Sequence, residues 1–220
     1  MAKVEAGQIG NFNGKIGQVV LAKWRDVLVG RKVPVKSKKE GSGEQLDQRS
    51  KFALVTGFFK GLSGIINVGY QSQKTGMTPM NAAVKYHLGN AVTGVYPDYK
   101  LDYSKVLLSN ANLIGEVDGG FAPKLVPITQ SGVTVSWQMR GTSMNEDTSP
   151  DDLLNVLLYS VAKKRYVSFK QCAKRSELTV DLELPFFFNG DLCHGYMFFT
   201  SPNGKSVSLS EYLGQFTVLA

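Results

Sequence analysis

Apolar and polar residues alternate along the second half of the chain. Val133, Val135 and Trp137 alternate with polar residues, and the same period of two recurs from 178 to 184. This period gives a strand one apolar and one polar face. Further β-prone runs, separated by turn sequences, lie at 124–129, 153–161, 166–172, 192–200 and 207–218. Together these runs predict seven short strands within residues 121–220.

A different period, close to that of an α-helix, appears between 44 and 60. Ser42 lies three residues before Gln45, the spacing of a capping box that satisfies free N–H groups at a helix start. The residues expected to form the packed stripe are Leu46, Ser50, Ala53, Leu54, Gly57 and Phe58. The pattern predicts a helix over 44–60, interrupted afterwards by Gly61 and Gly64.

The sequence predicts a second helix start at Thr78-Pro79, where a hydroxyl cap is followed by proline at the first helical position. Its apolar stripe consists of Met80, Ala83, Val84 and Leu88. Gly89 is the expected C-terminal cap. After this helix we expect a turn at 96–98 and a strand over 102–109.

The first forty residues are irregular in their pattern. Glycines space residues 1–18 in a way that favours a loop or an arm. The β-prone runs 16–24 and 27–33 then flank Arg25-Asp26 and predict a hairpin that is apolar on both faces. An isolated two-stranded hairpin is marginally stable, so this one needs another surface to pack against. Residues 36–43 have the composition of an exposed linker.

These elements define the predicted architecture. The chain belongs to the α+β class, with an N-terminal β-hairpin and two helices followed by a seven-stranded immunoglobulin-like β-sandwich. We expect a first region, 1–120, made of the basic arm, the hairpin and the helices. The sandwich is expected over 121–220.

The charged residues are unevenly distributed along the chain. The chain has 220 residues, of which 43% are hydrophobic, and a net charge of +7. Residues 1–60 hold 12 basic and 5 acidic side chains, whereas the rest of the chain is balanced. A concentrated excess of this kind favours an anionic partner, although a solvated basic surface gives the same pattern. The candidate contact residues in this region are Trp24, Arg31, Lys32, Lys36, Lys38 and Lys39.

Three consecutive phenylalanines, Phe186, Phe187 and Phe188, form a second candidate contact. Successive side chains of a strand point to opposite faces, so the three cannot all enter one core. A local helical turn, the N-terminal region or another subunit could cover them. The run 196–199 is apolar on both faces in the same way. An interdomain core and a protein–protein contact are both open interpretations.

Catalytic and ligand-binding patterns are sparse. His87 and His194 are expected on a helix and on a strand, in structural roles, without a nucleophile motif beside them. Gly204-Lys205-Ser206 lacks the earlier glycine of a phosphate-binding loop and predicts a hairpin turn. The acidic loop 146–152 lacks the alternating ligands of a calcium site. Cys172 and Cys193 are expected to be ordinary apolar residues, with one disulfide between them left open. We therefore expect no catalytic, metal or cofactor site.

Two resemblances accompany these patterns. The phrase VTVSWQ at 133–138, together with MFFTSPNGKSVSLSEYLG after Tyr196, resembles a fibronectin type III or immunoglobulin-like domain over 121–220. That resemblance implies a tyrosine-corner role for Tyr196. The order GKIG, QLDQRSKFALV, MNAAVKYHL, YPDYKLDYSKVLLS and SEYLG is similar to an uncharacterised family from the Bacteroidota, along nearly the whole chain. This second resemblance implies no activity.

The sequence therefore favours a non-enzymatic structural, assembly or interaction protein. One version is a component of a phage-like or other self-assembling particle. The alternative is a nucleic-acid-binding protein that uses the basic N-terminal hairpin and linker. We expect a protein partner or self-association, no membrane contact and no cofactor. Without a signal sequence or an apolar span, the expected location is the cytoplasm or a particle assembled there.

Overall fold

The computed structural model describes residues 2–4, 13–24, 27–35, 40–71, 77–110, 123–128, 131–138 and 149–219. The chain divides into two compact units, Met1–Gly43 and Glu44–Ala220. Each unit is described by itself. The boundary predicted near residue 120 stays a prediction, because 111–122 lie outside the described residues.

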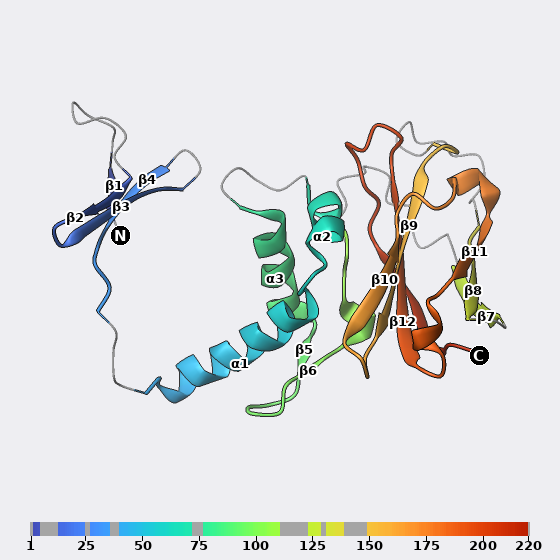
Figure 1. The fold of residues 1–220 in the computed structure, drawn as a ribbon, viewed down its shortest axis with the longest axis horizontal. Helices are drawn as coiled ribbons and strands as arrows, with labels where there is room; N and C mark the ends of the chain where they lie inside the picture. Colours follow the sequence, from blue (N-terminus) through green and yellow to red (C-terminus); the bar gives the residue numbers. More distant parts are fainter. Residues whose placement is uncertain are drawn as a thin grey trace. The chain divides into compact units, whose positions relative to one another are not determined.

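The first unit is a four-stranded antiparallel sheet in the order β1-β4-β3-β2 (Figure 1). Its strands are β1 (Ala2–Val4), β2 (Gly14–Ile16), β3 (Val19–Trp24) and β4 (Val27–Lys32). The predicted hairpin is confirmed, since β3 and β4 pair over their whole length. The expectation of an irregular arm before it was incomplete. Two short strands flank the hairpin, and the positive φ of Gly14 and Gly17 brings the chain into β2 and out of it.

The second unit opens with helices and a small hairpin. Its first elements are α1 (Gly43–Phe58), α2 (Ser63–Gly69), α3 (Pro79–Asn90), β5 (Val92–Thr93), β6 (Lys100–Leu101) and the 3₁₀ turn η1 (Tyr103–Lys105). Both predicted helices are present. The Thr78 hydroxyl accepts a hydrogen bond from the N–H of Asn81 at 3.1 Å, the capping contact expected at that helix start.

Seven strands follow, in two antiparallel sheets. Their bounds, with those of two further 3₁₀ turns, are β7 (Lys124–Ile128), β8 (Gly132–Ser136), β9 (Leu153–Ser160), β10 (Arg165–Phe169), η2 (Arg175–Glu177), β11 (Thr179–Glu183), η3 (Phe186–Phe188), β12 (Leu192–Thr200) and β13 (Glu211–Thr217). One sheet has the order β11-β8-β7 and the other the order β10-β9-β12-β13. The chain is thus of the mixed α+β kind, with most of its strands in the C-terminal part.

The two middle strands of this unit's four-stranded sheet, β9 and β12, are buried on both faces. Along β12, Met197 and Phe199 lie in a core shared with the three-stranded sheet, whereas Tyr196 and Phe198 lie in a core shared with the helices. Figure 1 shows the sheet between these two layers. The interpretation of 196–199 as two-sided core is confirmed, and the strand is covered by its own chain on each side.

The strand predicted over 102–109 was wrong. After η1 the backbone is extended, but its N–H groups find side-chain acceptors instead of a neighbouring strand. The N–H of Leu107 donates to Nε2 of His87 at 3.0 Å, and that of Leu108 donates to Oγ of Ser210 at 2.8 Å. Backbone groups in a buried segment must be paired, and here two distant side chains do it.

The helical region differs from expectation in three details. Gly64 does not interrupt a helix but lies within α2, whose Ile65 and Ile66 are buried. Gly89 is not a cap, because α3 continues to Asn90 and ends at Ala91. In α1 the predicted stripe is only partly covered: Phe58 is buried as expected, whereas Leu46, Ala53 and Gly57 face solvent. The other buried residue of that helix is Val55, which lies outside the stripe.

No single described helix is both long and apolar enough to span a membrane. Helices α1 and α2 meet the requirement only when taken together, and they bend by 94° at the break between them.

Candidate interaction surfaces

The predicted basic residues that the structure describes lie on the sheet of the first unit. Arg31 and Lys32 are exposed at the end of β4. The strand register places Lys15, Val20 and Arg31 in one row across β2, β3 and β4. Directly opposed residues of a sheet share a face, so Lys15 and Arg31 flank Val20 on one face. Lys32, as the next residue, belongs to the other face.

Four of the predicted basic-region contacts are not placed by their side chains. Trp24 ends β3 with its backbone opposite Val27, and its side chain is outside the described part of the structure. Lys36, Lys38 and Lys39 also lie outside the described residues. Their part in a contact stays a prediction.

The same small sheet carries apolar side chains in the open. Ile16 and Val19 lie opposite each other and are 49% and 45% exposed. Val27, on the opposite face from them, is also exposed. Among the residues of this unit whose side chains are described, Leu28 alone is a buried hydrophobic. Among the described residues of this unit, each face of the sheet therefore has exposed apolar side chains, Ile16 and Val19 on one face and Val27 on the other.

The phenylalanine triplet forms the 3₁₀ turn η3 in the second unit, the local helical turn that was one of the expected alternatives. Phe188 is fully buried in the core between the two sheets, whereas Phe186 is 81% exposed. Phe187, at 39% exposure, lies between them, with ring-centre distances of 4.8 Å to Phe188 and 6.2 Å to Phe186. The three rings form a continuous aromatic path from the core to the surface.

Hydrogen bonds hold this turn in place. The N–H groups of Asn189 and Asp191 donate to the carbonyls of Phe186 and Phe188 at 3.0 and 2.9 Å. The Lys163 ammonium donates to the carbonyl of Phe187. All three phenylalanine carbonyls thus have a donor, and the exposed rings are carried on a fixed backbone.

Cations surround the exposed rings. Lys163 forms an ion pair with Asp191 at 2.9 Å, and hydrogen bonding from that lysine lowers the pKa of the carboxyl. The Arg165 guanidinium lies 5.9 Å from the Phe187 ring centre, within cation–π range. Lys164 between them is exposed. The turn and its surroundings combine exposed aromatic rings with an arginine, residue types that are enriched at interaction surfaces.

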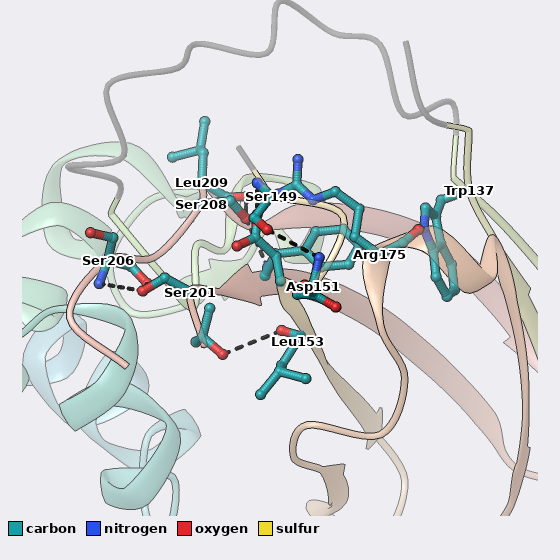
Figure 2. Close-up of polar contacts among 12 residues, drawn as sticks. Trp137, Ser149, Asp151, Leu153, Arg175, Ser201, Ser206, Ser208 and Leu209 are labelled. Carbon is teal, nitrogen blue, oxygen red and sulfur yellow. Dashed lines mark hydrogen bonds and ion pairs between the residues drawn. The ribbon is translucent and has the colours of Figure 1, made fainter. Parts of the chain in front are cut away.

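A buried polar cluster without a sequence motif lies around Arg175 and Trp137 in the second unit (Figure 2). Nη2 of Arg175 lies 3.1 Å from Oδ2 of Asp152, and both side chains are almost fully buried. The indole N–H of Trp137 donates to the Arg175 carbonyl at 2.8 Å, and the guanidinium lies 4.5 Å from the Phe199 ring centre. Burial raises the pKa of Asp152, with the guanidinium opposing the shift.

This cluster has a structural role. Asp152 also accepts the N–H of Ser149 at 3.1 Å, and its neighbour Asp151 pairs with Lys174 at 2.9 Å. The described part of the acidic loop is thus committed to protein cations. Among the described residues no group of three or more His, Cys, Asp and Glu side chains could hold a metal ion. Trp137 and Arg175 are 38 residues apart, and no local motif links them.

His87 is fully buried and joins two segments. Its Nδ1 donates to the Ala83 carbonyl at 2.7 Å, while its Nε2 accepts the N–H of Leu107 at 3.0 Å. This pairing requires the neutral ring, and burial lowers the pKa of His87 accordingly. The histidine fastens α3 to the chain after η1, in the structural role expected for it.

His194 lies on β12 among tyrosines. Its ring stacks on Tyr103 with centres 4.2 Å apart, and its Nδ1 is 2.7 Å from the hydroxyl of Tyr212. Burial lowers the pKa of His194. On the same strand face, the hydroxyl of Tyr196 donates to the Tyr103 carbonyl at 2.8 Å. A tyrosine corner bonds to backbone a few residues upstream, so that role was wrong for Tyr196. It joins η1 to the sheet instead.

The remaining motifs have ordinary structural explanations. Gly204 has a positive φ in a turn closed by the Ser201 N–H donating to the Ser206 carbonyl at 3.0 Å, so the hairpin-turn prediction is confirmed. Cys172 and Cys193 are free thiols, and burial raises the pKa of each to about 11. Both are therefore protonated at neutral pH.

Comparison with known protein families gives a match over most of the chain. The model of a family described as "Family of unknown function (DUF6266)" matches residues 11–214. No curated protein matches the chain.

Proposed function

This chain belongs to the DUF6266 family, and we propose that it is a non-enzymatic assembly or interaction protein, of the kind that builds a phage-like or other self-assembling particle. The observation that carries this proposal is the sheet of the first unit, which leaves apolar residues exposed on both faces. Domains of about 40 residues rarely fold alone without disulfides, metals or association. A sheet of this size and composition gains stability by binding another surface.

The edges of that sheet offer a way to bind. In the described order β1-β4-β3-β2, strands β1 and β2 are the outer ones. An outer strand presents unpaired backbone groups to which a strand of another chain can add. Strand addition uses main-chain hydrogen bonds, so it suits a glycine-rich segment with few specific side chains. We propose that the first unit reaches a neighbouring subunit in this way.

The second unit would then be the rigid scaffold, with an immunoglobulin or fibronectin III-like sandwich at its centre. Strand order supports this finer assignment. The first, second and fifth of the seven strands share one sheet, and the third, fourth, sixth and seventh share the other. This division is that of the constant-type immunoglobulin fold except for the fourth strand, which here pairs with the third instead of joining the first sheet. Such sandwiches present loops and turns at two ends, which suits a protein that works by contact.

The test is the mass of the full chain in solution, by light scattering over a range of concentrations at low and high salt. We expect a mass above 24.1 kDa that rises with concentration. In the variant Val19→Asp, a charge on the exposed apolar row should lower that mass, whereas Val95→Asp, at an exposed residue of the β5–β6 hairpin, serves as the matched control. A chain that stays monomeric at every concentration overturns the proposal.

A second function, nucleic-acid binding, is favoured by one specific observation. Residues 1–43 hold nine basic and three acidic side chains, and Lys15 and Arg31 lie in one row. Phosphate contacts make affinity fall with salt, by a log–log slope of about 0.9 for each contact. Lys15→Glu with Arg31→Glu should reduce the slope for duplex DNA or RNA. Binding that is absent, or equally steep in this variant, rejects this function.

A further inference from the structure

We propose that the exposed phenylalanine turn of one molecule docks on the outer face of the β7-β8-β11 sheet of a second copy of this chain. The inference rests on the proposed assembly function and names the surfaces that meet. The phenylalanine knob consists of Phe186, Phe187, Lys164 and Arg165. The receiving face consists of Val126, Ile128, Thr134, Asp181 and Glu183.

The phenylalanine knob is pre-organised for binding. Phe186 is 81% exposed, yet the backbone of its turn is held by bonds to all three phenylalanine carbonyls. An aromatic side chain on a fixed backbone loses little conformational entropy when it binds. Aromatic residues and arginine are also the residues most enriched among those that dominate binding energy. The exposed ring and Arg165 therefore have the composition of an interface centre.

The receiving face has the complementary layout. Register places Val126, Thr134 and Asp181 in one row across β7, β8 and β11, and Ile128, Gly132 and Glu183 in the next. Val126 and Ile128 on β7 are 54% and 37% exposed. The middle strand carries only short side chains on this face, at Gly132, Thr134 and Ser136. The apolar side chains of β7 and the acidic side chains of β11 thus lie on either side of the short side chains of β8.

Charge decides which partner the knob fits. Lys164 and Arg165 give the knob two exposed cations, whereas Asp181 and Glu183 give the face two exposed carboxylates. The Thr134 hydroxyl donates to Asp181 at 2.6 Å and keeps that carboxylate on the face. Among the described residues of this face, Lys124 is the cation. It lies at the end of the sheet away from Ile128 and Glu183, in the row of Ser136 and Thr179. A second copy therefore supplies both the apolar and the acidic surface that the knob requires.

The docking would join two different surfaces of the same chain. Such a contact is heterologous, and its repetition gives a closed ring or an extended assembly. This outcome agrees with a protein that builds a particle, and it assigns the sandwich a direct part in the assembly.

The test measures self-association of full-length variants by sedimentation velocity, with circular dichroism to verify folding. Phe186→Ser should weaken association at least about 10-fold, since central aromatic residues contribute most of the binding energy. Phe52→Ser removes a phenylalanine that is 53% exposed on α1 and should leave association unchanged. Equal association of the Phe186 variant and the wild type overturns the contact.

A charge exchange makes the test specific. Lys164→Glu with Arg165→Glu, and separately Asp181→Lys with Glu183→Lys, should each weaken association. All four changes in one chain restore opposite charges across the contact and should restore association. A four-fold variant as weak as either pair overturns the contact. A wild type that never associates overturns the proposed function as well, whereas an associating chain insensitive to these changes overturns this contact alone.

Discussion

The two sheets with apolar residues on both faces differ in what covers them. In the second unit, β12 places Met197 and Phe199 in one core and Tyr196 and Phe198 in another, all within 2% of full burial. In the first unit, β2, β3 and β4 have the same two-sided pattern, but Ile16, Val19 and Val27 are exposed.

A strand that is apolar on both faces must be covered on both. Its sequence, however, does not indicate which part of the same or of another molecule covers it. The helices cover one face of β12 and the three-stranded sheet covers the other. For the sheet of the first unit, we propose that another chain does so. The comparison makes quantitative predictions, because side chains with different cover respond differently to the same substitution.

The largest effect is expected where the second unit buries charge. Asp152→Ala leaves the Arg175 guanidinium without its carboxylate in a buried site, which should lower the free energy of unfolding by about 3–5 kcal/mol. Chemical denaturation followed by circular dichroism measures it. Replacing both residues, as Asp152→Leu with Arg175→Met, should recover much of the loss. A single variant as stable as the wild type would show that the pair lies in water.

Truncating one buried and one exposed aliphatic residue tests the difference in cover directly. Leu157 on β9 is fully buried against the helices, so Leu157→Ala should cost about 2–5 kcal/mol of unfolding free energy. Val19→Ala, at a residue that is 45% exposed, should change the unfolding of the monomer by no more than about 0.5 kcal/mol. Denaturant midpoints at low protein concentration make the comparison. Similar losses in the two variants would show that the first unit is covered in the monomer.

A third difference is a dependence on pH that belongs to the second unit, which holds both histidines of the chain. Burial lowers the pKa of His87 and of His194 below the usual 6.5. As pH falls through 6.5, the unfolded chain binds protons before the folded one, so stability is complete above this pH and declines below it. Thermal unfolding between about pH 7.5 and about pH 5 should show this decline. His194→Phe should make the decline shallower. A midpoint independent of pH would contradict the neutral, buried state of both rings.

Much of the fold could be predicted from local pattern. The seven strands of 121–220 were evident because each alternates or is bounded by turns, and both long helices had a recognisable start. The strand expected over 102–109 failed for a non-local reason. Its backbone donors pair with the side chains of His87 and Ser210, which are distant in sequence. The helix α2 was missed because Gly61 and Gly64 were expected to interrupt the helical region. Gly69, the last residue of α2, allows the close approach of Leu108.

The candidate sites, like the fold, could be predicted only in part from local sequence. The phenylalanine triplet stood out because three large apolar residues cannot share one strand face. That Phe188 is buried and Phe186 exposed depends on a turn held by Lys163, which precedes it by two strands. The Arg175–Asp152 pair had no sequence signal, since a buried ion pair and an exposed one have the same composition.

Two glycines of the second unit, Gly57 and Gly69, have opposite surroundings. A Cβ added at Gly57 of α1 would meet no atom within 4 Å, whereas one at Gly69 would lie 2.1 Å from the Leu108 carbonyl oxygen. Gly57→Ala should therefore stabilise the chain by about 0.5–1 kcal/mol, the usual gain within a helix. Gly69→Ala should destabilise it, because backbone cannot move aside easily. Thermal unfolding of the two variants measures both signs.

The sign of the stability change in Gly57→Ala also tests whether the exposed face of α1 differs from the sheet of the first unit. The stripe predicted for α1 includes Leu46, Ala53 and Gly57, and all three are exposed. If that face is open in solution, Gly57→Ala raises the midpoint at every protein concentration, because the new methyl group meets only water. A gain at low concentration that becomes a loss at high concentration would mean that a second molecule packs there closely enough to exclude a Cβ. The exposed face of α1 would then be covered by another molecule in addition to the docking surfaces proposed above, and the contrast with the first unit would be one of degree.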